Sequence, residues 1–87
     1  MKRIVLFGYH HCPDCLPIVQ FLNRNFIDYT YIDILDSMPN LRKFMKYRDR
    51  HEAFAEVREK DYVGIPAIVI NDGEEIYLNE PDPSRLR

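Results

Sequence analysis

The sequence predicts an α/β fold in which helices cover both faces of one small mixed sheet. Residues 4–7 and 67–70 are apolar at every position, which is typical of strands that are buried on both faces. A helical pattern and a second strand, residues 28–34, follow the first of these runs. This order predicts a βαβ unit with parallel strands and a right-handed crossover. The sequence Asn-Asp-Gly at residues 71–73 predicts a hairpin that leads into a strand at residues 76–78.

The first helix is expected to begin at a pair of cysteines. Residues 8–11 form a loop, Cys12 is the expected N-cap, and Pro13 suits the first helical position because it has a fixed φ and no N–H. Pro17 cannot donate to the carbonyl of residue 13, so we expect a bend or a tight 3₁₀ turn after the site. The helix is expected to end near Asn25. Its apolar stripe comprises Ile18, Val19, Leu22 and Phe26.

A second helical region is expected after the second strand. Asp36 and Ser37 supply an N-cap, and Pro39 lies in the first turn. The apolar stripe breaks near His51 and then resumes until about Lys60. The pattern therefore predicts either one kinked helix or two consecutive helices.

Composition limits the class of protein. The 87 residues are expected to form one small domain, residues 1–87, with room for one modest core. Twelve basic and 14 acidic residues give a formal charge of −2, so we expect no nucleic-acid partner. The N-terminal apolar run has four residues, against about seven to fifteen in the core of a secretory signal, and no segment approaches membrane-spanning length. We therefore expect a cytoplasmic protein with no membrane partner, in a compartment that keeps thiols reduced.

Cys12-Pro13-Asp14-Cys15 is the motif that indicates chemistry, and it contains both cysteines of the chain. Two thiols at this spacing can close a local disulfide, and the positive end of a helix dipole favours the thiolate of the first one. Asp14 opposes that effect, because a nearby carboxylate disfavours a second negative charge. We expect Cys12 to be the solvent-facing nucleophile and Cys15 to lie one turn deeper on the same side.

The order of elements, together with the cysteine motif and the later Ile65-Pro66, resembles the glutaredoxins of the thioredoxin-like group over about residues 3–78. The resemblance implies a four-stranded mixed sheet in the order 2-1-3-4, flanked by helices, with a cis peptide bond before Pro66. It implies reduction of protein or glutathione mixed disulfides, with no bound cofactor. Protein disulfides are the implied partners, and glutathione or a reductase would restore the dithiol. The implied catalytic residues are Cys12 and Cys15, and the implied substrate-binding residues are Pro13, Asp14, Ile65 and Pro66.

Three departures from the family pattern bear on these expectations. Residues 78–82, Leu-Asn-Glu-Pro-Asp, replace the glycine pair and acidic residue that usually hold glutathione. Residues 9–11, Tyr-His-His, replace the Lys or Arg that commonly precedes the cysteines. The last helix of the family has no equivalent, since Pro81 and Pro83 oppose a regular helix there. We therefore expect a folded-over tail or a second copy of the chain to cover one face of the sheet.

Two other classes of function are open from the sequence alone. One is metal binding, because His10, His11, Cys12 and Cys15 form a zinc-type ligand set. Adjacent residues on such a loop rarely converge on one metal, so an iron–sulfur cluster shared by two chains is the stronger metal alternative. The other is a redox-inert adaptor, which would require an unreactive Cys12. Tyr29, Tyr31, Tyr62 and the basic residues around Arg48 are interpreted as packing and solvated surface.

Overall fold

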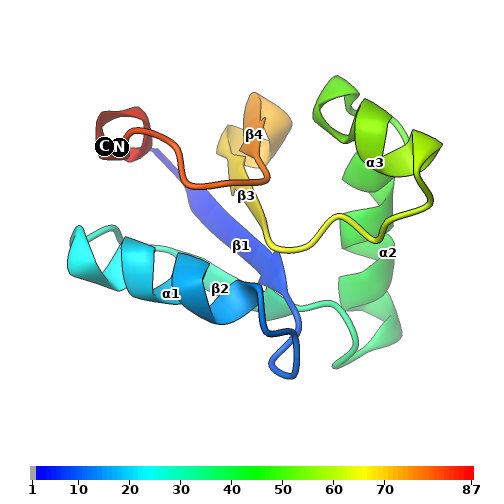
Figure 1. Ribbon diagram of the computed structural model, residues 1–87, viewed down its shortest axis with the longest axis horizontal. Coiled ribbons are helices and arrows are strands. Elements are labelled where there is room, and N and C mark those ends of the chain that lie inside the picture. Colours follow the sequence, from blue (N-terminus) through cyan, green and yellow to red (C-terminus); the bar gives the residue numbers. More distant parts are fainter. Residues whose placement is uncertain (1) are drawn as a thin grey trace.

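The computed structural model describes residues 2–87 and has one four-stranded sheet with helices on both faces (Figure 1). Its strands are β1 (Ile4–Gly8), β2 (Thr30–Asp33), β3 (Ala67–Ile70) and β4 (Glu75–Tyr77). β1 pairs in parallel with β2 and antiparallel with β3, and β3 pairs antiparallel with β4. The spatial order is β2-β1-β3-β4, which confirms the mixed sheet, and the β3–β4 hairpin is confirmed as well.

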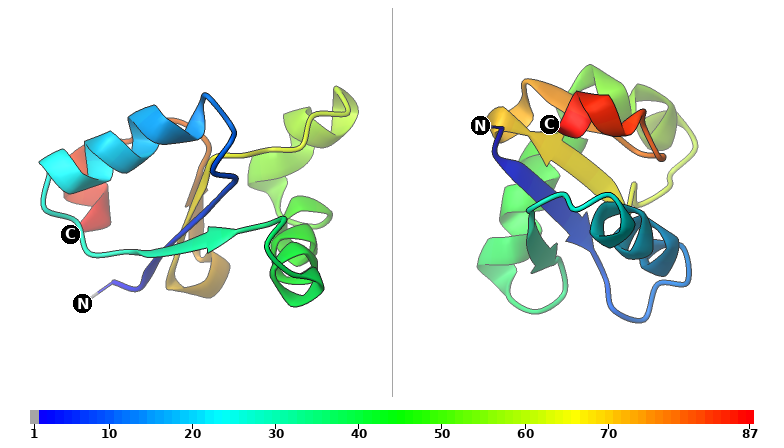
Figure 2. Two further views of the ribbon diagram at one scale, coloured as in Figure 1. Left: turned by 90° about the horizontal axis from the view of Figure 1, so that it is seen from below. Right: turned by 90° about the vertical axis from the view of Figure 1, so that its left-hand side faces the viewer.

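Two separate core layers hold the sheet between its helices (Figure 2). α1 (Cys15–Arg24) and the C-terminal 3₁₀ helix η3 (Pro83–Leu86) cover one face, whereas α2 (Met38–Arg48), the 3₁₀ helix η1 (Glu52–Phe54) and α3 (Ala55–Glu59) cover the other. All four side chains of β3 are buried, as the continuous apolar run predicted. Within residues 2–87, none of the helices is long and apolar enough to cross a membrane. The layer under α1 contains Ile4, Leu6, Ile18, Phe21, Leu22, Ile68 and Ile70, and the layer under α2 contains Phe7, Ile34, Phe44, Phe54 and Val69.

The C-terminal tail folds back over the sheet. Leu86 of η3 is 4% exposed and packs in the core layer that contains Ile68 and Ile70. Near the other end of the described chain, Lys2 Nζ donates to the carbonyl of Arg85 at 2.6 Å, so the start of the described chain is tied to this tail. A short 3₁₀ helix thus covers this face of the sheet, as expected for a folded-over tail.

The start of α1 differs from the expectation. The helix begins at Cys15 rather than at Pro13, and Asp14 occupies the N-cap position without a side-chain cap bond. Cys12 and Pro13 lie instead in a tight turn, which is closed by the N–H of Cys15 donating to the carbonyl of Cys12 at 3.2 Å. Pro17 therefore falls in the first turn of the helix, where an N–H needs no intrahelical partner. The predicted position of the tight turn was wrong, because it precedes α1 rather than following the site.

The end of α1 corrects a second expectation. Phe26 has a φ of 56°, and its N–H donates to the carbonyl of Asn23 at 3.1 Å. The N–H of Ile27 donates to the carbonyl of Leu22 at 3.0 Å, which completes a Schellman motif. The side chain of Phe26 is 93% exposed, so its assignment to the buried stripe was wrong. The reason is that the chain changes from right-handed to left-handed backbone before Phe26 can point to the core.

The second helical region forms two consecutive helical stretches, one of the two predicted alternatives. Ser37 caps α2 by accepting from the N–H of Asn40 at 3.2 Å. α2 ends at Arg48, and a new helical stretch begins after His51, whose Nδ1 accepts from the N–H of Ala53 at 3.0 Å. The prediction that His51 marks the break is confirmed.

Candidate active site

The two cysteines lie where the loop after β1 enters α1, close to the central strand of the sheet. The N–H of Cys12 donates to the carbonyl of Tyr9 at 2.8 Å, which fixes the loop that carries the first thiol. Both cysteines are free, Cys12 is half-buried, and Cys15 is only 2% exposed. One thiol therefore faces the solvent while the second lies behind it in the protein.

The environment of Cys15 keeps its thiol protonated. Its pKa is raised from 9.0 to about 11, and burial is the largest cause. A hydrogen bond with Cys12 and the charges of Cys12 and Asp14 also raise this pKa, whereas a backbone hydrogen bond with Tyr9 lowers it. Cys15 is thus a neutral thiol at pH 7 while Cys12 is reduced.

Gly8, the last residue of β1, leaves room for two side chains that the sequence did not connect. A Cβ atom on Gly8 would lie 2.9 Å from the hydroxyl oxygen of Tyr31 and 3.1 Å from the Sγ atom of Cys15. Burial raises the pKa of Tyr31, and the charges of Cys15 and Asp33 raise it further. Tyr31, interpreted from the sequence as packing or sheet surface, thus brings its hydroxyl to the cysteine pair. A glycine in a buried strand is a signal for such a close approach.

Asp33, at the end of β2, holds the loop that precedes the cysteines. Its Oδ2 atom lies 2.6 Å from Nδ1 of His10 and accepts from the N–H of His10 at 3.3 Å, and its Oδ1 atom accepts from the N–H of Leu35 at 2.9 Å. The hydrogen bond with His10 is the main reason why the pKa of Asp33 is lowered. His10 therefore pairs with Asp33.

Most of the expected substrate-binding residues meet beside Cys12. The Ile65–Pro66 peptide bond is cis, and Ile65 and Pro66 line two adjoining grooves together with Asp14 and Leu78. The groove that contains Cys12 has a volume of about 560 Å³, and the other has a volume of about 590 Å³. Pro13 is exposed and lies outside both grooves.

Comparison with known proteins identifies the family. The glutaredoxin family model matches residues 4–76. The chain belongs to the glutaredoxin family. An uncharacterized protein of Haemophilus influenzae is 36% identical over 74 residues, which cover 85% of this chain and 86% of that relative. No solved structure matches the chain. Family and fold together confirm the resemblance drawn from the cysteine motif and from Ile65-Pro66, and they place this glutaredoxin among the thiol-oxidoreductase-like proteins.

The metal-ligand set suggested by the sequence does not assemble within one chain of this glutaredoxin. Across residues 2–87, no group of three or more His, Cys, Asp or Glu side chains is close enough to hold a metal ion. His10 points to Asp33, and Cys15 is buried behind Cys12. An iron–sulfur cluster shared by two chains would need thiolates from a second molecule and stays a prediction.

Proposed function

We propose that this glutaredoxin is a thiol–disulfide oxidoreductase that reduces mixed disulfides of proteins or of glutathione. The observation that supports this function is the placement of the two thiols. Cys12 is half-buried in a groove beside Ile65 and Pro66, and Cys15 is buried behind it. Such an arrangement suits one thiol that meets the substrate and a second that completes the exchange.

In the first step, the Cys12 thiolate attacks one sulfur of the substrate disulfide. A new S–S bond joins Cys12 to the substrate, the S–S bond of the substrate breaks, and the departing thiolate takes up a proton. Ile65 lines the same groove, and its backbone would pair with an extended substrate segment, as in strand addition. That pairing would hold the substrate sulfur next to Cys12.

In the second step, Cys15 attacks the Cys12 sulfur and releases the substrate as a thiol. Two of the causes that raise the pKa of Cys15 come from Cys12, namely a hydrogen bond and a negative charge. Once Cys12 is in a mixed disulfide, its charge is absent, so Cys15 loses its proton more easily at the step in which it must attack. The product is a Cys12–Cys15 disulfide, and the two electrons of the dithiol have passed to the substrate.

The cycle closes when a thiol reductant, glutathione or a dithiol reductase, reduces the Cys12–Cys15 disulfide. A cytoplasmic location, where small thiols and reductases keep cysteines reduced, fits this requirement. The protein itself needs no bound cofactor for either step, because both reacting groups are its own cysteines.

The test uses a short peptide whose cysteine is in a mixed disulfide with a small thiol. The reduced protein should release the peptide thiol and lose two mass units as the Cys12–Cys15 disulfide forms. Cys15→Ser should stop with one half of the disulfide, peptide or small thiol, bound to Cys12 and the other half released as a thiol, and Cys12→Ser should form no adduct. The proposal fails if the wild-type protein does not consume the disulfide, or if Cys12→Ser consumes it at the same rate.

A further inference from the structure

Two adjoining grooves share Ile65 and Pro66, and their linings differ in chemical character; Cys12 lines one of them. The first, which we call the acidic groove, is lined by Asp14, Pro17, Ile18, Leu78, Asn79 and Glu80 together with Ile65 and Pro66. The second, the apolar groove, contains Cys12 and is lined by Val57, Tyr62, Val63 and Leu78 among others. Asp14, Ile65, Pro66 and Leu78 belong to both, so a substrate held at Ile65 would extend into each groove.

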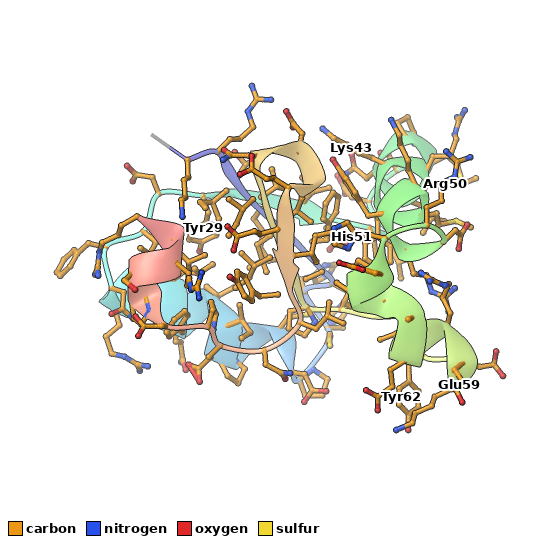
Figure 3. The ribbon with its side chains drawn as sticks, turned by 90° about the horizontal axis from the view of Figure 1, so that it is seen from above. Tyr29, Lys43, Arg50, His51, Glu59 and Tyr62 are labelled. Atoms are coloured by element: carbon orange, nitrogen blue, oxygen red, sulfur yellow. The ribbon has the colours of Figure 1, made fainter. Side chains whose placement is uncertain are left out.

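Charge in these grooves has one sign. Asp14 and Glu80 are their ionisable carboxylates, and no Lys, Arg or His lines either groove in the described part of the chain. Arg24 reaches Glu80 only at 3.9 Å, with both side chains at least half exposed, so it neutralises that carboxylate weakly. Figure 3 shows Lys43 and Arg50, two of the basic side chains, on the opposite side of the second helical region from Tyr62.

One side of the apolar groove is formed by Tyr62 and Val63, whose backbone is bonded to a side chain of α2. Tyr62 and Val63 are 62% and 55% exposed, which is unusual for a pair of large apolar side chains in one short segment. Their carbonyls accept hydrogen bonds from Arg48, at 2.6 Å from Nη2 to Tyr62 and at 3.1 Å from Nε to Val63. Tyr62 and Val63 are therefore exposed on a segment whose backbone is held in place by the side chain of Arg48.

Glutathione is a poor match to these linings. It carries two carboxylates and one ammonium at neutral pH, so its net charge has the same sign as Asp14 and Glu80. An extended polypeptide matches better if it has a basic side chain on one side of its cysteine and an apolar side chain on the other. The basic side chain would lie near Asp14 and Glu80, and the apolar one would cover Tyr62 and Val63.

We propose that the substrates of this protein are polypeptide disulfides whose reacting cysteine is flanked by a basic and an apolar residue, and that glutathione mixed disulfides are disfavoured. This inference rests on the proposed oxidoreductase function and names its substrate class. The chemistry is the same exchange: the substrate disulfide gains two electrons, Cys12 and Cys15 lose them and form a disulfide, and their protons end on the released thiols.

The test compares blocked peptides that differ in one flanking residue. Leu-Cys-Lys is paired with Leu-Cys-Glu, and Lys-Cys-Leu with Glu-Cys-Leu, each as a mixed disulfide with 2-mercaptoethanol so that the leaving group is constant. The lysine peptide should have a kcat/KM about five- to tenfold higher than the glutamate peptide in one of the two orders, at low salt. At about 0.5 M salt this preference should fall toward one, because exposed charges are then screened within a few ångströms.

Matched variants test whether the preference for lysine arises in the acidic groove. Glu80→Gln should lower the lysine-to-glutamate ratio of kcat/KM values to about half, because one of the two carboxylates loses its charge. Glu74→Gln removes the same charge from the β3–β4 turn, at the opposite end of the sheet from Gly8, and should leave the preference unchanged. Tyr62→Ser should reduce the advantage of a peptide with Leu over one with Ser at the apolar flank.

The outcomes separate this inference from the function on which it rests. Equal rates for the lysine and glutamate peptides in both orders would overturn the inference, as would a glutathione mixed disulfide that reacts faster than the best peptide. A preference that Glu74→Gln lowers as much as Glu80→Gln does would also overturn it. Failure to react with any peptide, or with the disulfide of 2-mercaptoethanol, would overturn the oxidoreductase function itself.

Discussion

Replacing Gly8 by Ala is expected to destabilise the protein by about 1–3 kcal/mol, the usual cost of an extra methyl group in a packed region. The new Cβ atom would lie 2.9 Å from the Tyr31 hydroxyl oxygen, 3.1 Å from Cys15 Sγ and 3.4 Å from Tyr31 Cζ. Normal carbon contacts are about 3.5–4.0 Å, so at least one side chain must move. The φ of Gly8 is not in the left-handed region, so lack of space rather than backbone strain sets the cost. Tyr31 is the group that can move, because it lies on the edge strand β2 and is 36% exposed.

The same geometry predicts a partial rescue. Tyr31→Phe removes the oxygen at 2.9 Å but leaves the Cys15 sulfur at 3.1 Å, so Gly8→Ala should cost about half as much in that background. Urea denaturation of the wild type, both single variants and the double variant measures the four free energies of unfolding. Each kcal/mol should also lower Tm by about 4–8 °C in a domain of this size. Equal costs of Gly8→Ala in the two backgrounds would show that the hydroxyl is not the obstacle, and the reasoning would be refuted.

Three further predictions concern the buried thiol, the tail and the second helical region. Because the pKa of Cys15 is raised to about 11 in the folded protein, the stability that its neutral thiol contributes is present below about pH 9 and is lost as the pH rises through 11. Between pH 9 and 11, the free energy of unfolding of the wild type should therefore fall by about 2 kcal/mol more than that of Cys15→Ala. Parallel curves for the two proteins would contradict this assignment. Leu86→Ala should cost about 2–4 kcal/mol by thermal or chemical denaturation, because the side chain is 4% exposed, while Leu35→Ala, at a position 60% exposed, should change stability by less than about 0.5 kcal/mol. Arg48→Gln should speed amide hydrogen exchange at residues 60–64, since it removes the bonds to the carbonyls of residues 62–63, and unchanged exchange there would argue against that role.

The fold could be predicted largely because its signals are local. A continuous apolar run identifies a strand covered on both faces, and both such runs, residues 4–7 and 67–70, lie in the two central strands. Capping residues such as Ser37 and His51 carry their hydrogen-bonding groups within two or three positions of their partners. The order of the strands came from the family resemblance, since pairing between distant segments leaves little trace in a single sequence.

The candidate site was predicted less completely, because its missing parts depend on distant contacts. The approach of Tyr31 to Cys15 over Gly8 joins three elements, and no spacing rule links them. Arg48 was assigned to a solvated helix face, yet its side chain bonds to a segment more than ten residues away. Phe26 was misplaced because the helix ends two residues before it, at Arg24, and Phe26 itself adopts left-handed backbone, which is uncommon for a residue other than glycine.

The two hydrogen bonds from Arg48 to the carbonyls of Tyr62 and Val63 allow catalysis and substrate contact to reside in different segments of the chain. Residues 9–15 carry the reacting sulfurs. The exposed side chains of Tyr62 and Val63 belong to a segment that is bonded to Arg48 of α2, and α2 packs on the opposite face of the sheet from α1. Changes of sequence between α2 and Pro66 can therefore reshape what docks beside the thiols without disturbing the thiols themselves. Divergence among close relatives is expected to concentrate in that stretch, so exchanging it between two of them would transfer partner preference while the exchange chemistry stayed the same.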